Sequence, residues 1–337
     1  MVTLRQVAER AGVSVKTVSR IVNDDPAVRG KTRDSVLAVV RAMNYVPNEA
    51  ARIMRMGASS VVGLMTDAVA TTPYSVDIVR GAQAELKLQK KTLLIANTDG
   101  EPDIEREYWR MFRAHNVSGV IYATMYHRPL SLGQPEFRAS IVLANCFAEN
   151  GAQSSIVPDD EAGGYVQAEH LLKLGHRHIG VISLFPILAA TRLRGDGHRR
   201  AFQDAGVAFD TTMQACGVEG TLDAERIVSY DAALAMLSRH NRPTAIICGN
   251  DKIALQVFGA AAHLGLSVPD DLSIIGFDDM LVISESLRPA LTTVALPYFE
   301  IGRQAALMIQ SAAEDGPTQR IRVPCPLVER NSCRKLN

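Results

Sequence analysis

The sequence predicts an α/β protein in which a small helical unit precedes two doubly wound parallel sheets. Three observations support this fold class. The first 45 residues contain a helix, a glycine turn and a second helix; from Val61 onward, apolar runs of strand length alternate with longer amphipathic segments; and turn signals near 151–160 divide that alternation. So many strand–helix units fit two sheets better than a closed (β/α)₈ barrel, which remains a minor alternative.

Charge is distributed unevenly along the chain. The 337 residues carry 36 Lys and Arg against 36 Asp and Glu, so the whole chain gives no electrostatic argument for a nucleic-acid partner. Residues 1–58, however, contain ten basic and five acidic side chains, which leaves this segment at +5 and the remainder at −5. A cationic N-terminal segment favours nucleic-acid binding by that part of the chain.

No feature of the sequence predicts export or membrane insertion. The N-terminus turns polar at once and lacks the apolar core of a signal peptide, and no apolar run is long enough to span a bilayer. The five cysteines are scattered and the eight histidines lack metal-ligand spacing, apart from His176 and His178, which we expect to be structural. We therefore expect a cytoplasmic protein without a cofactor, a metal site or a membrane partner.

Three short helices are expected between residues 3 and 45. Thr3 and Gln6 fit a capping box, and Gly12 should end the first helix near Ala11. Ser14 is expected to cap the second helix and Thr32 the third. The side chains expected to face inward from the second and third helices are Val18, Ile21, Val22, Val36, Val39, Val40 and Met43.

A hinge is predicted after this headpiece, which comprises residues 1–46. Pro47 stops the third helix, and residues 48–58 carry too few apolar side chains to form an independent core. The expected domains are thus the headpiece, a hinge helix or linker at 47–59, and a core at 60–337.

The core is expected to alternate strands with helices, as parallel sheets covered on both faces require. The expected strands are 61–65, 92–96, 119–123, 140–144, 178–183, 244–249 and 272–277. The expected helices are 75–90, 102–115, 161–174, 192–206, 222–240, 251–265 and 297–313.

The second headpiece helix has an outer face suited to DNA. Val15 is an apolar residue that points away from the small core and could meet a thymine methyl, while Lys16 and Arg20 lie four residues apart on the same face. The residues that could donate to phosphates are Ser14, Thr17 and Asn23. A solvated cationic helix face is the alternative. The glycine turn, the caps and the local charge together favour DNA binding.

Polar residues follow most of the expected strands, where ligands bind in open parallel sheets. Individually each has a structural alternative, because such loops are generally polar and Asp251 or Asp279 could simply cap the next helix. As a set they predict a polar ligand cleft. They are Asp67, Asn97, Asp99, Tyr126, Asn145, Asn250, Asp251, Asp278 and Asp279.

Seven strings stand out along nearly the whole chain: TLRQVAERAGVSVKTVSRIVN (3–23), NYVPNEAAR (44–52), GHRHIGVI (175–182), RLRGDGHRRAF (192–202), NDKIAL (250–255), GFDD (276–279) and LTTV (291–294). Together these strings resemble the lactose/galactose repressor (LacI/GalR) family. The resemblance implies a helix-turn-helix headpiece, a hinge helix and a two-lobed core similar to periplasmic sugar-binding proteins, with three passages of the chain between the lobes. The implied N-lobe is about 60–158 and 292–320, and the implied C-lobe about 159–291 and 321–330.

The resemblance also implies residue roles. Val15, Lys16 and Arg20 would read bases, Asn48 would join the DNA contacts, and Met54 would insert into the minor groove from the hinge.

In the cleft, Arg194, Asn250 and Asp278 match the family's main polar ligand contacts, and an interlobe ion pair between Arg194 and Asp278 is the structural alternative. The remaining residues expected at the effector are Asp67, Asn145, which departs from a frequent aspartate, and the wall residues Tyr74 and Tyr298.

These features predict a DNA-binding transcriptional regulator, most simply a repressor, controlled by a small polar effector such as a sugar or sugar derivative. A homodimer on a pseudo-palindromic operator is expected, because two-fold proteins present equivalent recognition helices to two half-sites. A sugar-binding protein or a sugar-converting enzyme on the same core is the alternative. No catalytic residue is expected, because no nucleophile with a base, phosphate loop or nucleophile elbow is found.

Overall fold

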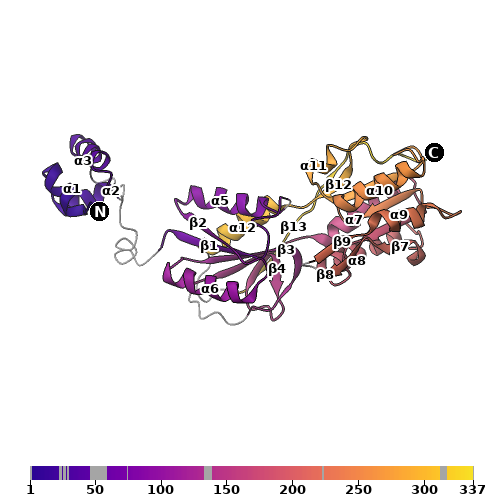
Figure 1. Cartoon of the computed structure of the whole chain (residues 1–337), viewed down its shortest axis with the longest axis horizontal. Helices are drawn as coiled ribbons and strands as arrows, with labels where there is room; N and C mark the ends of the chain where they lie inside the picture. The colour runs from indigo at the N-terminus through magenta and orange to yellow at the C-terminus, as the bar shows by residue number, and fades with distance from the viewer. Residues whose placement is uncertain are drawn as a thin grey trace. The chain divides into compact units, whose positions relative to one another are not determined.

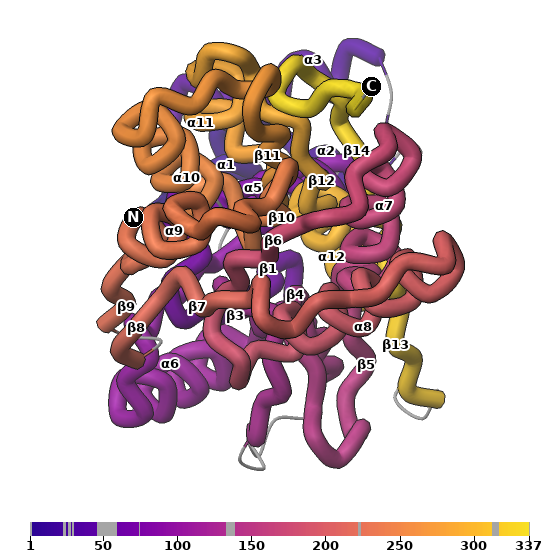
Figure 2. Tube along the Cα trace, turned by 90° about the vertical axis from the view of Figure 1, so that its right-hand side faces the viewer, coloured from indigo at the N-terminus to yellow at the C-terminus, as the bar shows by residue number. Residues whose placement is uncertain are grey.

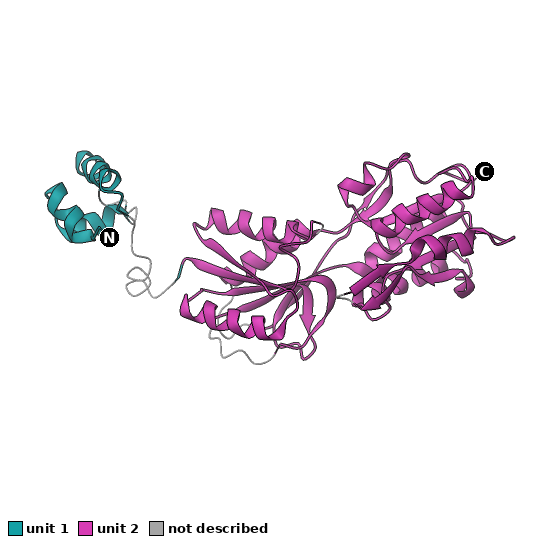
Figure 3. Cartoon of the chain, in the orientation of Figure 1, with its two compact units in different colours: residues 1–59 teal, residues 60–337 magenta. Residues whose placement is uncertain are grey.

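The structure is a computed structural model that describes residues 2–22, 25, 28, 30–45, 59–73, 75–132, 139–221, 224–311 and 317–336. The chain forms two compact units, Met1–Ser59 and Ser60–Asn337 (Figure 3). Within the described ranges, no helix combines the length and the apolar character needed to cross a bilayer.

The first unit contains three helices around a small apolar core. They are α1 (Leu4–Ala11), α2 (Val15–Val22) and α3 (Lys31–Ala42). Thr3 and Gln6 form the expected capping box, and Gly12 ends α1 in the left-handed region at φ 64°. The core contains Val7, Ala8, Val18, Ile21 and Val36, all buried.

The expected cap at Thr32 is wrong. Helix α3 begins at Lys31 after Gly30, whose φ of 78° turns the chain into the helix, and no side chain caps this end. Thr32 is an exposed residue of the first turn, because the positive φ available to glycine places the helix start before it.

The second unit contains two six-stranded sheets, which define its two lobes (Figure 1). The N-lobe sheet has the order β13-β5-β4-β3-β1-β2, and all neighbouring strands in this order pair in parallel. Its strands are β1 (Val61–Thr66), β2 (Thr92–Asn97), β3 (Val120–Leu130), β4 (Ile141–Ala148), β5 (Ser154–Pro158) and β13 (Arg320–Val323).

The C-lobe sheet has the order β14-β12-β11-β10-β6-β7. Only the edge strand β14 pairs antiparallel, with β12; the other described pairings are parallel. The strands are β6 (Ile179–Ser183), β7 (Gln214–Cys216), β10 (Ala245–Cys248), β11 (Ser273–Asp278), β12 (Thr292–Ala295) and β14 (Leu327–Val328).

Helices cover both faces of each sheet, as buried parallel strands require. In the N-lobe, α5 (Asp77–Leu88) and α12 (Tyr298–Ser311) pack on one face and α6 (Pro102–Ala114) on the other. In the C-lobe, α7 (Asp160–Lys173) and α8 (Ala189–Asp204) cover one face, and α9 (Ser229–Leu237) and α10 (Asp251–His263) cover the other. The short helix α11 (Leu281–Ser284) follows β11.

The chain passes between the lobes three times, which confirms the expected architecture: from β5 to α7, from β12 to α12, and from β13 to β14. Figure 2 labels the two strands that this last passage joins, β13 and β14, both in yellow. Two expected lobe boundaries are corrected. Residues 292–295 pair with β11 in the C-lobe, and residues 320–323 pair with β5 in the N-lobe.

The helix expected at 222–240 is wrong in its first part. Residues Ala224–Ile227 form β9, which pairs antiparallel with β8 (Val218–Thr221), and α9 starts only at Ser229. Gly220, at φ 94°, allows the chain to bend within β8, and the hairpin pairing outweighs the helix propensity of Ala224, Glu225 and Arg226.

Glycines let two helix pairs approach closely, one pair in each lobe. A Cβ atom at Gly164 of α7 would overlap the backbone of Arg194, and one at Gly197 of α8 would overlap the carbonyl of Glu161. In the N-lobe, Gly81 of α5 faces the carbonyl of Phe299 in the same way. Helices α7 and α8 therefore lie side by side in backbone contact (Figure 1).

We expect Gly197→Ala to destabilise the protein by about 1–3 kcal/mol, because the added methyl group forces α7 and α8 apart. Urea unfolding measures this. Gly195→Ala is the matched control on the same helix: its Cβ would meet nothing nearer than Arg199 Nη1 at 3.6 Å, so the gain in helix propensity, up to about 1 kcal/mol, should make it neutral or stabilising. Equal destabilisation by both substitutions would contradict the close-approach argument.

Candidate functional site

The outer face of α2 presents the predicted DNA-reading residues. Ser14 Oγ accepts from the backbone N–H of Thr17 at 3.1 Å and so caps the helix as expected. Val15 is 44% exposed, and Lys16 is also exposed. Arg20 forms an ion pair with Asp25, with Nε 2.8 Å from Oδ2.

Four predicted site residues lie outside the described residues. They are Asn23, Asn48, Met54 and Tyr74. The predicted hinge at 48–58 also lies there, so these assignments remain predictions.

A cavity lies between the two lobes and is lined from both. The N-lobe contributes Ser75, Tyr126, His127, Asn145 and Tyr298, and the C-lobe contributes Arg194, Asn250, Lys252, Asp278 and Met280. The cavity measures about 50 Å³, whereas small-molecule pockets usually measure about 300–1,000 Å³. The lobes are therefore closed in this conformation, with polar side chains gathered between them.

Several of these polar groups have no partner within the described chain. The buried Ser75 Oγ makes no hydrogen bond. Asn145 donates its amide to the carbonyls of Thr124 and Met125 at 2.9 and 3.0 Å, which leaves its Oδ1 as an acceptor. Asn250 uses its Oδ1 to cap α10, which leaves its amide N–H groups as donors. The cavity thus offers both donors and acceptors to a ligand.

Asp278 provides a carboxylate at the end of β11, and no hydrogen bond or ion pair of its side chain is found among the described residues. Burial raises its pKa to about 7, against the opposing effect of the Arg194 and Lys252 cations. Its backbone, with φ at 106°, is in a region that favours glycine. Such strain is concentrated at functional sites in proteins.

Arg194 belongs to a buried ionic cluster. Its Nε donates to Asp160 Oδ1 at 2.6 Å and its Nη1 donates to the carbonyl of Gly249 at 2.7 Å. The guanidinium also lies over the Phe277 ring, 3.5 Å from the centroid. On the other side, His127 Nδ1 lies 2.6 Å from Asp160 Oδ2. Burial alone would raise the pKa of Asp160, but Arg194 and His127 hold it below its ordinary value.

A second polar bridge joins the lobes. The Tyr126 hydroxyl, from the irregular part of β3, donates to Glu225 Oε2 at 2.6 Å. Glu225 lies on the β8–β9 hairpin and also accepts from Lys252 Nζ at 3.1 Å. The closed cleft is therefore held by hydrogen bonds between side chains that come from different lobes.

Comparison with known proteins identifies the family that shares this headpiece and core. Residues 3–48 match the lacI family of bacterial regulatory proteins, and residues 168–333 match the periplasmic binding protein-like domain. The sucrose operon repressor of Escherichia coli is 35% identical, with 98% of this chain and 100% of the relative covered. The chain belongs to the LacI family.

Further relatives agree over the full length. The transcriptional regulator DegA of Bacillus subtilis is 33% identical, with 99% of both chains covered. The crystal structure of a LacI-family regulator protein from Rhizobium etli is 41% identical with a TM-score of 0.77, covering 82% of this chain and 99% of its own. The Lac repressor dimer bound to operator and the anti-inducer ONPF is 25% identical with a TM-score of 0.80, with 99% of both chains covered. The protein is thus a DNA-binding transcriptional repressor with an effector-binding core.

The LacI-family core brings together five of the seven predicted effector residues: Asn145, Arg194, Asn250, Asp278 and Tyr298 all line the interlobe cavity. Asp67 is not among the lining residues. Its carboxylate accepts from the backbone N–H groups of Ala68 and Met125 and from Arg128. Because these N-lobe partners occupy both of its oxygens, we leave Asp67 out of the proposed site.

Sequence reasoning missed several residues of the site. Ser75, His127 and Lys252 line the cavity, and Glu225 bridges the lobes, although none of them follows directly after a core strand. The alternative expected for Arg194 was an interlobe ion pair with Asp278. This alternative is wrong, because Arg194 pairs with Asp160. Asp160 lies where the chain first passes between the lobes. The only sequence signal for this passage is the group of turn residues near 151–160.

Within the part of the chain that the structure describes, no three His, Cys, Asp or Glu side chains are grouped to hold a metal ion. His176 binds Thr244 and the carbonyl of Arg334, and His178 binds the carbonyl of Asn241. Their partners give both histidines structural roles at the start of β6.

Asp160→Ala is expected to lower the free energy of unfolding by about 3–5 kcal/mol, because it leaves the Arg194 guanidinium buried without its counter-charge. Denaturant unfolding at neutral pH measures the change. The neighbouring Asp159→Ala removes only a helix cap, the acceptor for the Ala162 N–H, and should cost about 1 kcal/mol. A similar loss of stability in the two variants would contradict the proposed contribution of the Asp160–Arg194 ion pair to folding.

Proposed function

We propose that this LacI-family repressor binds a carbohydrate between its core lobes and that the sugar changes its affinity for operator DNA. The convergence of unpartnered polar groups from both lobes on one cavity carries the proposal. Ser75 and Asn145 on one side and Asn250 and Asp278 on the other offer donors and acceptors to neighbouring hydroxyl groups, while the tyrosine rings of Tyr126 and Tyr298 supply apolar walls.

A sugar cannot enter the closed cleft without lobe movement, because the cavity is too small. Opening would break the Tyr126–Glu225 hydrogen bond and expose the ligand groups. The effector would then act through its differential affinity for two lobe arrangements, which in turn set the separation of the two hinges in a dimer. The homodimer and a pseudo-palindromic operator belong to this proposal and are supported by the similarity to the Lac repressor dimer on its operator.

A thermal-shift panel of sucrose, maltose, lactose, glucose, fructose, galactose and ribose tests the sugar proposal. Sucrose is the first candidate, because a sucrose operon repressor is 35% identical over nearly the whole chain. A sugar present at 100 times its dissociation constant should stabilise the protein by about 2.7 kcal/mol. If no sugar of the panel shifts the melting temperature at a saturating concentration, the proposal of a carbohydrate effector is wrong.

Affinity for the sugar that gives the largest shift should increase with pH up to about 7 and then level off. Asp278 has its pKa raised to about 7 by burial, and only the ionised carboxylate accepts hydrogen bonds from two hydroxyl groups at full strength. Sugar binding therefore favours the ionised form, and affinity should fall by up to about tenfold per pH unit below 7. Calorimetry between pH 5.5 and 8.5 measures this.

Asp278→Asn is the control for this pH profile. It should bind the sugar more weakly and with a flat profile, while operator binding in a gel-shift assay without sugar stays close to wild type. An unchanged pH dependence in Asp278→Asn would assign the titration to another group.

Arg20→Ala should weaken specific operator binding by about 1–3 kcal/mol and relax the preference at one base pair in each half-site. The reason is that Arg20 lies on the exposed face of α2, although its guanidinium must leave Asp25 to reach a base. Gel shifts with an operator library at fixed salt measure both effects. The control is Arg5→Ala, which removes an exposed arginine from α1. Uniform weakening on all sequences by Arg20→Ala would make it a phosphate contact.

A further inference from the structure

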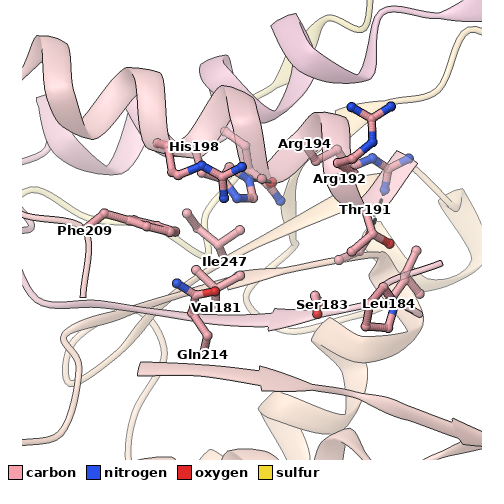
Figure 4. A pocket seen from close by; sticks show the side chains of 15 residues that line it. Val181, Ser183, Leu184, Thr191, Arg192, Arg194, His198, Phe209, Gln214 and Ile247 are labelled. Carbon is pink, nitrogen blue, oxygen red and sulfur yellow. Dashed lines mark hydrogen bonds between the residues drawn. The ribbon is translucent and has the colours of Figure 1, made fainter. Parts of the chain in front are cut away.

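The C-lobe contains a second cavity that the proposed sugar site does not use. It lies between α8 and the strands β6, β7 and β10, and measures about 350 Å³, enough for a small organic molecule. Figure 4 shows side chains of α8 facing those of the strands across this space. Its apolar wall consists of Val181, Leu184, Pro186, Phe209 and Ile247.

Two neighbouring ridges of α8 line this cavity. The more buried ridge consists of Thr191, Arg194 and His198, which follow the spacing i, i+3, i+7. The outer ridge has the same spacing, shifted by one residue, and consists of Arg192, Gly195 and Arg199. Gly195 leaves room between the two outer arginines, because a Cβ there would meet nothing nearer than Arg199 Nη1 at 3.6 Å.

His198, a buried side chain, supplies an acceptor for which the described residues offer no donor. The Gln167 amide nitrogen donates to the carbonyls of Cys248 and Gly276 at 3.0 and 2.8 Å, so the Gln167 Oε1 must accept. That oxygen lies 3.0 Å from His198 Nε2, which therefore carries the proton. Burial lowers the pKa of His198 to about 3, so the ring is neutral. Its Nδ1 is then an acceptor, and no described residue donates to it.

The charge around the cavity is positive. The lining includes Arg192, Arg194 and Arg199 and no acidic side chain. Arg192 and Arg199 share a single carboxylate, that of Asp196, and both are more than half exposed. Thr191 Oγ1 is also buried without a hydrogen-bond partner. Two cations against one anion leave a net positive charge beside an apolar wall.

We propose that this α8 cavity is a second ligand site, which binds a small organic anion with an apolar body and a hydroxyl group. The anionic group would pair with Arg199 and Arg192, the body would pack on the apolar wall, and the hydroxyl would donate to His198 Nδ1. The site is separate from the interlobe cavity but shares Arg194 and Leu184 with it. An occupant therefore contacts a side chain that also lines the sugar cleft.

Isothermal titration of the full-length protein with 4-hydroxybenzoate tests the site, with two matched probes. Benzoate lacks the hydroxyl donor and 4-hydroxybenzamide lacks the charge. We expect saturable binding of 4-hydroxybenzoate and at least tenfold weaker binding of each of the other two. Equal affinity for all three, or no saturable binding of 4-hydroxybenzoate, would overturn the proposal.

Variants assign the binding to the α8 cavity. Arg192→Gln/Arg199→Gln should weaken 4-hydroxybenzoate at least tenfold, and His198→Phe should remove the advantage of the hydroxyl over benzoate. The control is Arg200→Gln, since Arg200 is an exposed arginine of the same helix that pairs with Glu161 outside the cavity; it should bind like wild type. A loss in Arg200→Gln equal to that of the double variant would show nonspecific attraction and contradict the site.

The same experiment separates this site from the proposed sugar site. Asp278→Asn should retain 4-hydroxybenzoate binding while it weakens the sugar. Loss of both ligands in Asp278→Asn would place the anion in the interlobe cavity and reject a second site, whereas absence of a sugar response with intact anion binding would reject only the sugar proposal.

Discussion

The compensation of one buried negative charge organises the centre of this protein. Asp160 is fully buried where the chain first passes between the lobes, and a carboxylate there is tolerable only with charged or hydrogen-bonded partners. Arg194 and His127 meet that requirement from the C-lobe and the N-lobe. Because the guanidinium is committed to Asp160, Asp278 has no ion pair among the described residues, and burial raises its pKa to about 7 despite the nearby Arg194 and Lys252 cations. A structural ion pair at the passage thus leaves a second carboxylate available to a ligand.

The lobes are held together by polar contacts, and this explains why a ligand could control their arrangement. His127 with Asp160 and Tyr126 with Glu225 each join side chains from different lobes. The buried residues of each apolar core, in contrast, come from a single lobe. Hydrogen bonds between lobes can be exchanged for hydrogen bonds to a hydroxylated ligand at small net cost, since each contributes only about 0.5–1.5 kcal/mol. Separation of an apolar core would cost far more.

Much of the site followed from the sequence because its residues obey a simple geometric rule. Asn250 follows β10 and Asp278 ends β11, and such carboxyl ends of parallel strands meet at one edge of a sheet. Asn145 follows the strand expected at 140–144, although β4 continues past it to Ala148. Arg194, on a helix, was found through the resemblance to a known family. Three residues of the site were not predicted from the sequence. His127 lies on the irregular extension of β3, Glu225 on the β8–β9 hairpin and Asp160 at the lobe passage. Hydrophobic periodicity does not encode any of these features. The same limit misplaced two lobe boundaries, since β12 and β13 are only four residues long.

The glycine contacts between paired helices restrict how this chain could be re-engineered or could diverge. Gly164 and Gly197 bring the backbones of α7 and α8 together, and Gly81 and Gly302 do the same for α5 and α12. Any larger side chain at these positions requires a compensating shift of an entire helix, so no single neighbouring substitution can repair it. Residues that face the cleft carry no such restriction, and new effector specificities should therefore arise by changes there while the four glycines stay fixed. Exchange of whole lobes between related repressors should succeed most often when each helix pair is transferred as one block.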